Sequence, residues 1–251
     1  MDIVNSKFEW ARHHFELLNE QVSSYMKTNP CRFVADPEIT TDVRGRRFVY
    51  GRLRVDTPIP DSLSMVLGDC LSNLRSCLDY LIWELVRANG NNPSDRSGFP
   101  ICIKPSAWDK EIKRGTLDGI DNRAGTLIET MQPYHAGNPE QSLLAVLHEF
   151  TNINKHRRLL LTSVKTQAPP HDIKTVDGQS FALLNPPRTQ DDAVFGPFEV
   201  IGDQVKMEAQ AIAFIGIDEA PAKRFELTSL VERIARFIDQ DVLPQFDEFF
   251  R

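Results

Sequence analysis

Apolar residues recur every three or four positions over long stretches of the chain, the spacing that places side chains on one face of a helix. From about Ser6 to Met26 this pattern predicts a first helix, which Asn29 and Pro30 end. The longest stripe predicts a second helix from about Asp61 to Asn89. Its expected core positions are Leu67, Cys70, Leu71, Leu74, Cys77, Leu78, Leu81 and Leu85.

Shorter helical patterns follow the second helix. The same spacing predicts helices at about 108–114, 120–131 and 138–156. A last helix is expected to start at Thr228 or Ser229, because Ser229 and Glu232 fit a capping box.

Alternating patterns predict strands in two places. One pair, at about 31–35 and 47–56, is expected to form a β-hairpin near the N-terminus. The other strands are predicted at about 159–164, 179–184, 198–201 and 205–217.

The order of these elements favours an α+β fold, a helical bundle packed on an antiparallel β-sheet, because helices and strands come in runs rather than in strict alternation. We expect a single α+β domain over residues 1–251. Residues 1–157 would be mainly helical with a β-hairpin at about 31–57, and residues 158–251 would be mainly strands plus a C-terminal helix.

Composition adds exclusions rather than a function. Apolar residues make up 41% of the 251 residues and the net charge is −6, so nucleic-acid binding would need a local basic patch. No apolar run is long enough to predict a membrane span, and the N-terminus lacks a secretory pattern.

The four cysteines form no CxxC motif, which favours buried, reduced thiols in a cytoplasmic protein. No cofactor motif and no metal-ligand spacing is present.

The stretch TNINKHRRLLL, residues 151–161, places basic and amide side chains at the edge of an apolar run. Helical phasing puts Asn154 and Arg157 on the core face and points Lys155 and His156 elsewhere. A buried Arg157 would need an acidic partner, for which the second helix offers Asp69, Asp79 and Glu84. Three roles remain open for this stretch: cations at a helix C-terminus, an anion site, or a tie between helix and sheet.

A second polar group lies along the predicted second helix. Arg75 and Asp79 are four residues apart and can pair, while Asn73 and Tyr80 fall on the other flank of the apolar stripe. The pair is consistent with a surface ion pair, a preorganised polar seam, or a brace for a neighbouring loop.

The segments GDCLSNLRSCLDYLIWELV, residues 68–86, and NINKHRRLLL, residues 152–161, together resemble a family of uncharacterised bacterial proteins. That family has a G-D-x-L-H-N-L-R-S-x-L-D-H-x-x-W helix and a later N-x-D-K-H-R motif. This chain departs from it at Ser72, Tyr80 and Asn154, where His, His and Asp are expected.

A looser resemblance is to HEPN domains, helical bundles that include RNases with an Arg, then four to six intervening residues, then a His on the same helix. Counting from Arg75, the eligible positions hold Tyr80, Leu81 and Ile82 and no His. The resemblance therefore implies a degenerate, non-catalytic member.

Three functions are consistent with the sequence, one of them a small-molecule binder with a pocket between sheet and helices that the loop around Phe99 to Trp108 gates. The first is a non-enzymatic binding or scaffold protein of bacterial type, associated with stress or defence. The alternative is a metal-independent RNase or nucleotide-handling enzyme with Arg75 and His156 as its catalytic candidates. The expected binding residues are Asn73, Asp79, Tyr80, Asn154, Lys155 and Arg157. The partner would be a protein, an RNA or a nucleotide, and a homo-oligomer is compatible with either function.

Overall fold

The computed structural model describes residues 1–159, 161–163, 173–175, 180–181, 194–200, 207–209, 215–222 and 225–250. The chain divides into two compact units. The helical unit comprises Met1–Glu20, Asp61–Leu160 and Glu219–Arg251, and the strand unit comprises Gln21–Pro60 and Leu161–Asp218. The predicted α+β class is confirmed, with helices and strands concentrated in different units.

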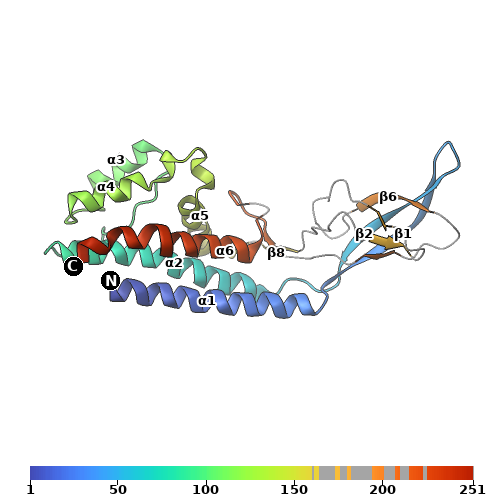
Figure 1. Cartoon of the computed structure of the whole chain (residues 1–251), viewed down its shortest axis with the longest axis horizontal. Coiled ribbons are helices and arrows are strands. Elements are labelled where there is room, and N and C mark those ends of the chain that lie inside the picture. Colours follow the sequence, from blue (N-terminus) through green and yellow to red (C-terminus); the bar gives the residue numbers. More distant parts are fainter. Residues whose placement is uncertain are drawn as a thin grey trace. The chain divides into compact units, whose positions relative to one another are not determined.

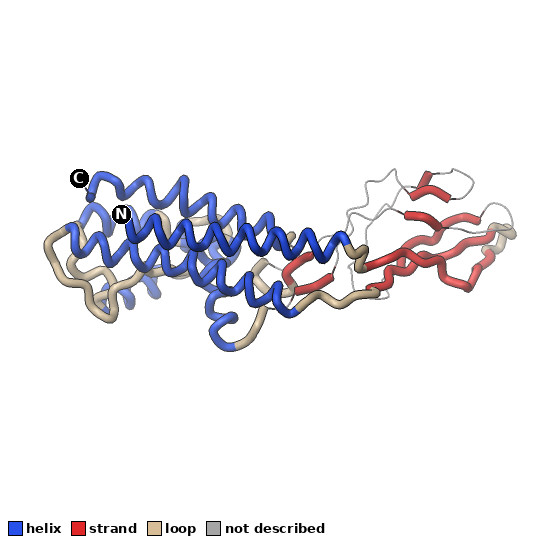
Figure 2. Tube along the Cα trace, turned by 90° about the horizontal axis from the view of Figure 1, so that it is seen from below, coloured by secondary structure: helices blue, strands red, loops and turns tan. Residues whose placement is uncertain are grey.

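The helical unit contains six α-helices among its described residues (Figures 1 and 2). They are α1 (Asp2–Lys27, of which residues up to Glu20 belong to this unit), α2 (Asp61–Ala88), α3 (Pro105–Arg114), α4 (Asn122–Thr130), α5 (Leu143–His156) and α6 (Leu227–Arg236). A π-helical turn at Phe237–Val242 and a 3-10 segment at Leu243–Phe250 continue α6, and short 3-10 turns lie at Pro133–His135 and Pro139–Gln141.

Helix α2 supplies the centre of the hydrophobic core. All eight positions of the predicted stripe are buried, so that prediction is confirmed. On the α1 side, the thiols of Cys70 and Cys77 donate to the backbone oxygens of Ala11 and Val4 at 3.5 and 3.6 Å. Burial raises the pKa of both thiols to about 12, which is consistent with the predicted packing role of reduced cysteines.

The starts of α5 and α6 differ from those predicted, and each has a side chain that caps it. Helix α5 starts at Leu143, because the Ser142 side chain accepts from the backbone N–H of Ala145 and the preceding Pro139 turn is a separate 3-10 element. Helix α6 starts at Leu227, with the Glu226 carboxylate rather than Ser229 as its N-cap. In both cases a side chain that accepts from free N–H groups fixes the start of the helix.

The strand unit contains the predicted β-hairpin. Strands β1 (Cys31–Thr41) and β2 (Arg47–Val55) pair antiparallel, with Gly45 at φ 77° in the turn between them. The register shifts between Ala35 and Ile39, and the Pro37 within this interval has no N–H to donate to a ladder. Strand β6 (Val194–Val200) pairs with the other edge of β2.

Five short strands complete the described part of the strand unit. β3 (Leu161–Ser163) pairs with β8 (Ile215–Ile217), and β4 (Ile173–Thr175) pairs with both β5 (Ser180–Phe181) and β7 (Met207–Ala209), all antiparallel. The long strand predicted at 205–217 is therefore described only at β7 and β8, and the rest of that prediction lies outside the described residues. No helix of the described part has the length and hydropathy needed to cross a membrane.

All three tryptophans of the chain belong to the helical unit. Trp10 lies on α1, Trp83 on α2 and Trp108 on α3. Trp10 and Trp83 are exposed, whereas Trp108 is buried. The indole of Trp83 donates to the backbone oxygen of Ser97 at 3.2 Å and so ties the loop after α2 to that helix.

Candidate functional site

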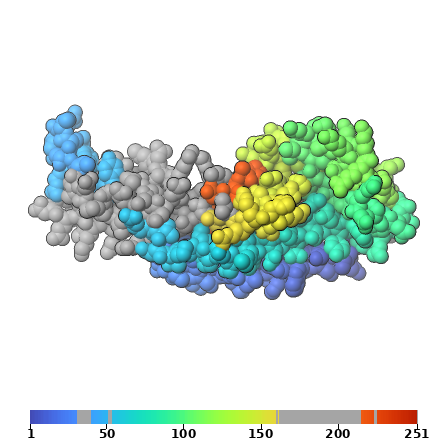
Figure 3. Space-filling model, turned by 180° about the vertical axis from the view of Figure 1, so that it is seen from behind, coloured from blue at the N-terminus to red at the C-terminus, as the bar shows by residue number. Residues whose placement is uncertain are grey.

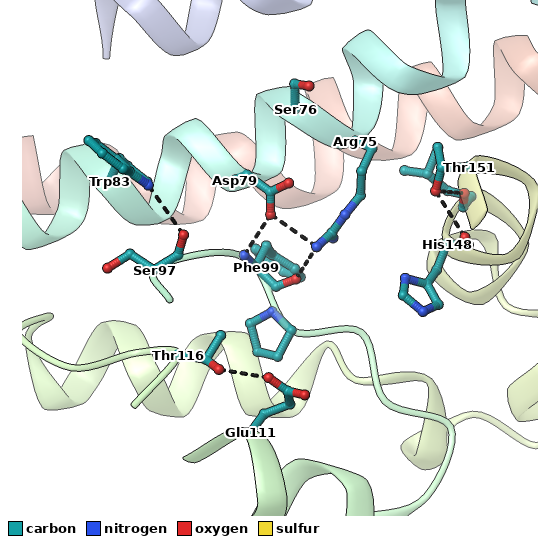
Figure 4. A network of polar contacts seen from close by, with 12 residues as sticks. Arg75, Ser76, Asp79, Trp83, Ser97, Phe99, Glu111, Thr116, His148 and Thr151 are labelled. Carbon is teal, nitrogen blue, oxygen red and sulfur yellow. Dashed lines mark hydrogen bonds and ion pairs between the residues drawn. The ribbon is translucent and has the colours of Figure 1, made fainter. Parts of the chain in front are cut away.

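Arg75 and Asp79, one turn apart on α2, form the predicted ion pair, with Arg75 Nη2 2.9 Å from Asp79 Oδ1. The pair also holds both backbone polar groups of Phe99 (Figure 4). Arg75 Nη2 donates to the Phe99 oxygen at 2.6 Å, and the Phe99 N–H donates to Asp79 Oδ1 at 2.9 Å. Of the roles considered for this pair, the structure shows the brace for a loop.

Burial affects the charge of both members of the pair. Burial lowers the pKa of Arg75, although the charges of Asp79 and Glu111 act in the opposite direction. Burial likewise raises the pKa of Asp79, against the effect of Arg75. The side chain of Arg75 is 19% exposed. Its Nη1 atom is buried and has no hydrogen-bond partner among the described residues.

His148, on α5, points toward the region that Arg75 and Glu111 border (Figure 4). Its Nε2 atom lies 3.0 Å from the amide nitrogen of Asn152, one turn further along the helix. The pKa of His148 is lowered, first by burial and then by the positive charges of Arg75 and Lys155, with Glu111 acting in the opposite direction. A neutral imidazole therefore stands beside a guanidinium at neutral pH.

Glu111 on α3 and Lys155 on α5 complete the group. Glu111 Oε2 accepts from the hydroxyl of Thr116 at 2.7 Å, and its charge acts on Arg75 and His148. The charge of Lys155 lowers the pKa of both Asp79 and His148. We call the following six residues the polar site: Arg75, Asp79, Glu111, His148, Asn152 and Lys155.

The sequence predicts three of these six residues as site residues, Arg75, Asp79 and Lys155, but not Glu111, His148 or Asn152. The spacing along the chain could have indicated His148. Asn152 and Lys155 follow His148 by four and seven residues, so all three share one face of α5. The contiguous KHR motif drew attention to His156 instead. His156 is exposed and is the last residue of α5, about 12 Å further along the helix than His148.

Asn154 is on the buried side of α5, as predicted, and it contacts a specific residue of α2. A β-carbon built on Gly68 would lie 2.3 Å from Asn154 Oδ1, well inside any real contact. The side chain of Asn154 therefore occupies the space that the missing side chain of Gly68 leaves. The two sequence motifs meet at this point, and the role of Asn154 there is packing between helices.

The prediction that Arg157 lies on the core face of α5 is wrong. The helix ends at His156, and Arg157 has extended backbone angles of φ −161° and ψ 161°. Its side chain is 51% exposed and pairs with Glu219 rather than with Asp69, Asp79 or Glu84. The two contacts are Nη1 to Oε1 at 2.5 Å and Nη2 to Oε2 at 3.0 Å, and this hydrogen bonding raises the pKa of Arg157.

The end of α5 lies on the surface of the helical unit, where Figure 3 shows it in yellow beside the orange segment that contains Glu219. Arg158 pairs with Asp61 at the start of α2. Lys155 and His156 lie in the last turn of α5, which fits the expected role of cations at a helix C-terminus, and the pairs of Arg157 and Arg158 fix the chain that follows the helix. Only Lys155 of the KHRR stretch contributes its charge to the polar site.

Asn73 and Tyr80 have other contacts. The amide of Asn73 donates to the backbone oxygen of Asp69 at 2.8 Å. Tyr80 is exposed, and Lys7 Nζ of α1 lies 5.5 Å from its ring centroid. Both side chains therefore contact α1 or their own helix, and neither makes a described contact with the polar site.

The polar site has the groups for binding an anion and for moving a proton. It offers a guanidinium, an ammonium and an imidazole as donors, together with two carboxylates. Within the described ranges, no group of three or more His, Cys, Asp or Glu residues could hold a metal ion.

Comparisons with protein-family models, with curated proteins and with solved structures find no match for this chain.

Proposed function

We propose that this protein is a non-enzymatic binding protein that receives an anionic group of its partner at the polar site. The observation that carries the proposal is the buried Nη1 atom of Arg75, which has no hydrogen-bond partner among the described residues. A buried donor without a partner costs about 1–3 kcal/mol, so native proteins rarely keep one without a use. An anion that accepts from Nη1 would remove this cost.

Preorganisation of Arg75 supports the same function. Asp79 and the Phe99 backbone already hold the Nη2 side of the guanidinium in place. A side chain that is fixed before the partner arrives loses little conformational freedom on binding. Lys155 is exposed and adds a second cation to the site.

Binding of labelled RNA oligonucleotides and nucleotides, followed by fluorescence anisotropy, tests the proposal. We expect Lys155→Ala to weaken binding about five- to tenfold, the effect of losing roughly 1 kcal/mol of charge interaction. Lys7→Ala is the matched control, because Lys7 lies over Tyr80 on α1 and should leave the affinity unchanged. Equal affinities for wild type and Lys155→Ala would contradict the proposal.

The alternative, a metal-independent RNase, has one specific observation in its favour. Burial and the positive charge of Arg75 lower the pKa of His148, and a neutral imidazole can accept a proton near pH 7. We therefore assign the acid–base role of this alternative to His148 instead of His156. Turnover of RNA by wild type and by His156→Ala, but not by His148→Ala, would establish the enzyme. No turnover by the wild type would leave the binding function.

A further inference from the structure

The charges of the polar site cancel when His148 is neutral. Arg75 and Lys155 carry one positive charge each, and Asp79 and Glu111 carry one negative charge each, so their sum is zero. Arg75 of α2, Glu111 of α3 and Lys155 of α5 itself act on the charge of His148, and Asp79 of α2 is paired with Arg75. Protonation of the imidazole brings the sum to +1. The attraction of the site for an anion therefore depends on the charge of His148.

The donors reach the site from two helices. Arg75 projects from α2, and His148 projects from α5 toward the same region (Figure 4). The amide nitrogen of Asn152 lies 3.0 Å from His148 Nε2 and donates to that atom in the neutral imidazole. In the imidazolium both ring nitrogens donate, so the amide turns and its oxygen accepts instead. Donors that approach from two helices can reach different oxygens of a tetrahedral oxyanion, whose oxygens do not lie in one plane, and arginine is a common ligand of phosphate groups. A single net positive charge also matches a group that carries a single negative charge.

We propose that the anionic group bound by this site is a phosphodiester, and that His148 takes up one proton when it binds. This inference rests on the proposed function and names both its ligand class and its control by pH. The phosphodiester oxygens accept from Arg75 and from the imidazolium of His148. No covalent bond of the ligand forms or breaks.

The direction of the pH dependence follows from the charges around His148. Burial and the charges of Arg75 and Lys155 hold its pKa below the ordinary value in the free protein, whereas the negative charge of the ligand raises the pKa in the complex. Between the two pKa values one proton is bound together with the ligand. The affinity then falls by about tenfold for each unit of pH increase within that window.

Isothermal titration calorimetry with a 5′-hydroxyl oligonucleotide tests the inference. Such a probe carries only diester phosphates, which do not titrate between pH 5.5 and 8, unlike a terminal phosphate with its pKa of about 6. Titrations in two buffers that differ in ionisation enthalpy give the number of protons taken up. We expect close to one proton for the wild type and for His156→Gln, whose exposed histidine lies at the helix end.

His148→Gln should bind more weakly at the acidic end of the range and take up no proton. Lys155→Ala should bind more weakly yet keep the proton uptake. A titration of the His148 imidazole by NMR, with and without oligonucleotide, covers the case in which His148→Gln does not fold, and its pKa should rise on binding.

The outcomes separate the inference from the proposed function. Oligonucleotide binding without proton uptake would overturn the role of His148 and leave the binding function in place. Equal or tighter binding of an acidic peptide would overturn the phosphodiester assignment alone. Binding of neither probe would overturn both.

Discussion

Gly68 sets how closely α2 and α5 approach each other. In a helix interior, glycine costs about 1 kcal/mol relative to alanine, so the sequence alone gives no reason for it. The structure supplies the reason, because a β-carbon at this position would lie 2.3 Å from Asn154 Oδ1. One residue without a side chain therefore allows the close approach of α2 and α5, which carry five of the six residues of the polar site.

We predict that Gly68→Ala lowers the free energy of unfolding by about 1–3 kcal/mol, the usual cost of overpacking, in spite of the better helix propensity of alanine. Urea denaturation measures the effect. The double variant Gly68→Ala with Asn154→Ala should recover much of the loss, since the second change removes the clash. Stabilisation by Gly68→Ala alone would show that the two helices separate at little cost.

Single residues were predictable from the sequence where their partners are close along the chain. The Arg75–Asp79 pair follows from its spacing of four residues. The partners of Arg75 and Arg157 in other elements, Phe99 and Glu219, lie 24 and 62 residues away in sequence. No periodicity connects such positions, so the loop brace and the true partner of Arg157 could only come from the fold.

At the scale of elements, the carboxylate of Glu226 determines where α6 begins. It accepts from the backbone N–H groups of Thr228 and Ser229 and from the Thr228 hydroxyl. Burial alone would raise the pKa of Glu226, but these hydrogen bonds bring it below its ordinary value. The folded state therefore holds this carboxyl group in its charged form more strongly than the unfolded chain does.

Glu226→Ala should destabilise the protein by about 1 kcal/mol, as the loss of an N-cap commonly does. Because the pKa is lowered on folding, this contribution is present above the pKa of an unfolded glutamate and is lost as the pH falls through the folded value. Thermal unfolding of both proteins at neutral and acidic pH measures the difference. Glu232→Ala is the control, since its exposed pair with Arg236 contributes little. A difference that persists unchanged in acid would argue against the cap.

The elements themselves were more predictable than their ends. The stripe of α2 and the first β-hairpin follow from periodicities of 3.6 and 2 residues, which depend only on local geometry. The starts of α5 and α6 depend on which side chain reaches the free N–H groups, and several neighbouring residues can do so. The capping box at Ser229 was a reasonable candidate, but the longer side chain of Glu226 takes that role.

At the scale of the whole molecule, the division into two units was not predictable. A length of 251 residues allows either one large domain or two small ones, and the helical unit is assembled from three separate stretches of sequence. Each unit has its own buried residues, such as Leu74 in the helical unit and Val49 in the strand unit. The sequence pattern assigns residues to a core but does not tell one core from another.

We predict that the two units differ in their response to core substitutions. Leu74→Ala should lower the stability of the helical unit by about 2–5 kcal/mol and shift the loss of the helical circular dichroism signal to lower urea. Val49→Ala should weaken the strand unit and leave the midpoint of that signal in place. Ser72→Ala, an exposed change on α2, controls for the first variant. Equal midpoint shifts for Leu74→Ala and Val49→Ala would mean that the chain unfolds as one cooperative body.

The placement of the tryptophans gives the chain a built-in optical label. Trp10, Trp83 and Trp108 all lie in the helical unit, whereas the strand unit holds Tyr25 and Tyr50. Light that excites only indole is therefore absorbed by one unit and not by the other. The emission of the unmodified protein reports directly on the environment of the helices, and a single-tryptophan variant that keeps Trp83, next to the braced loop, would report on that loop alone.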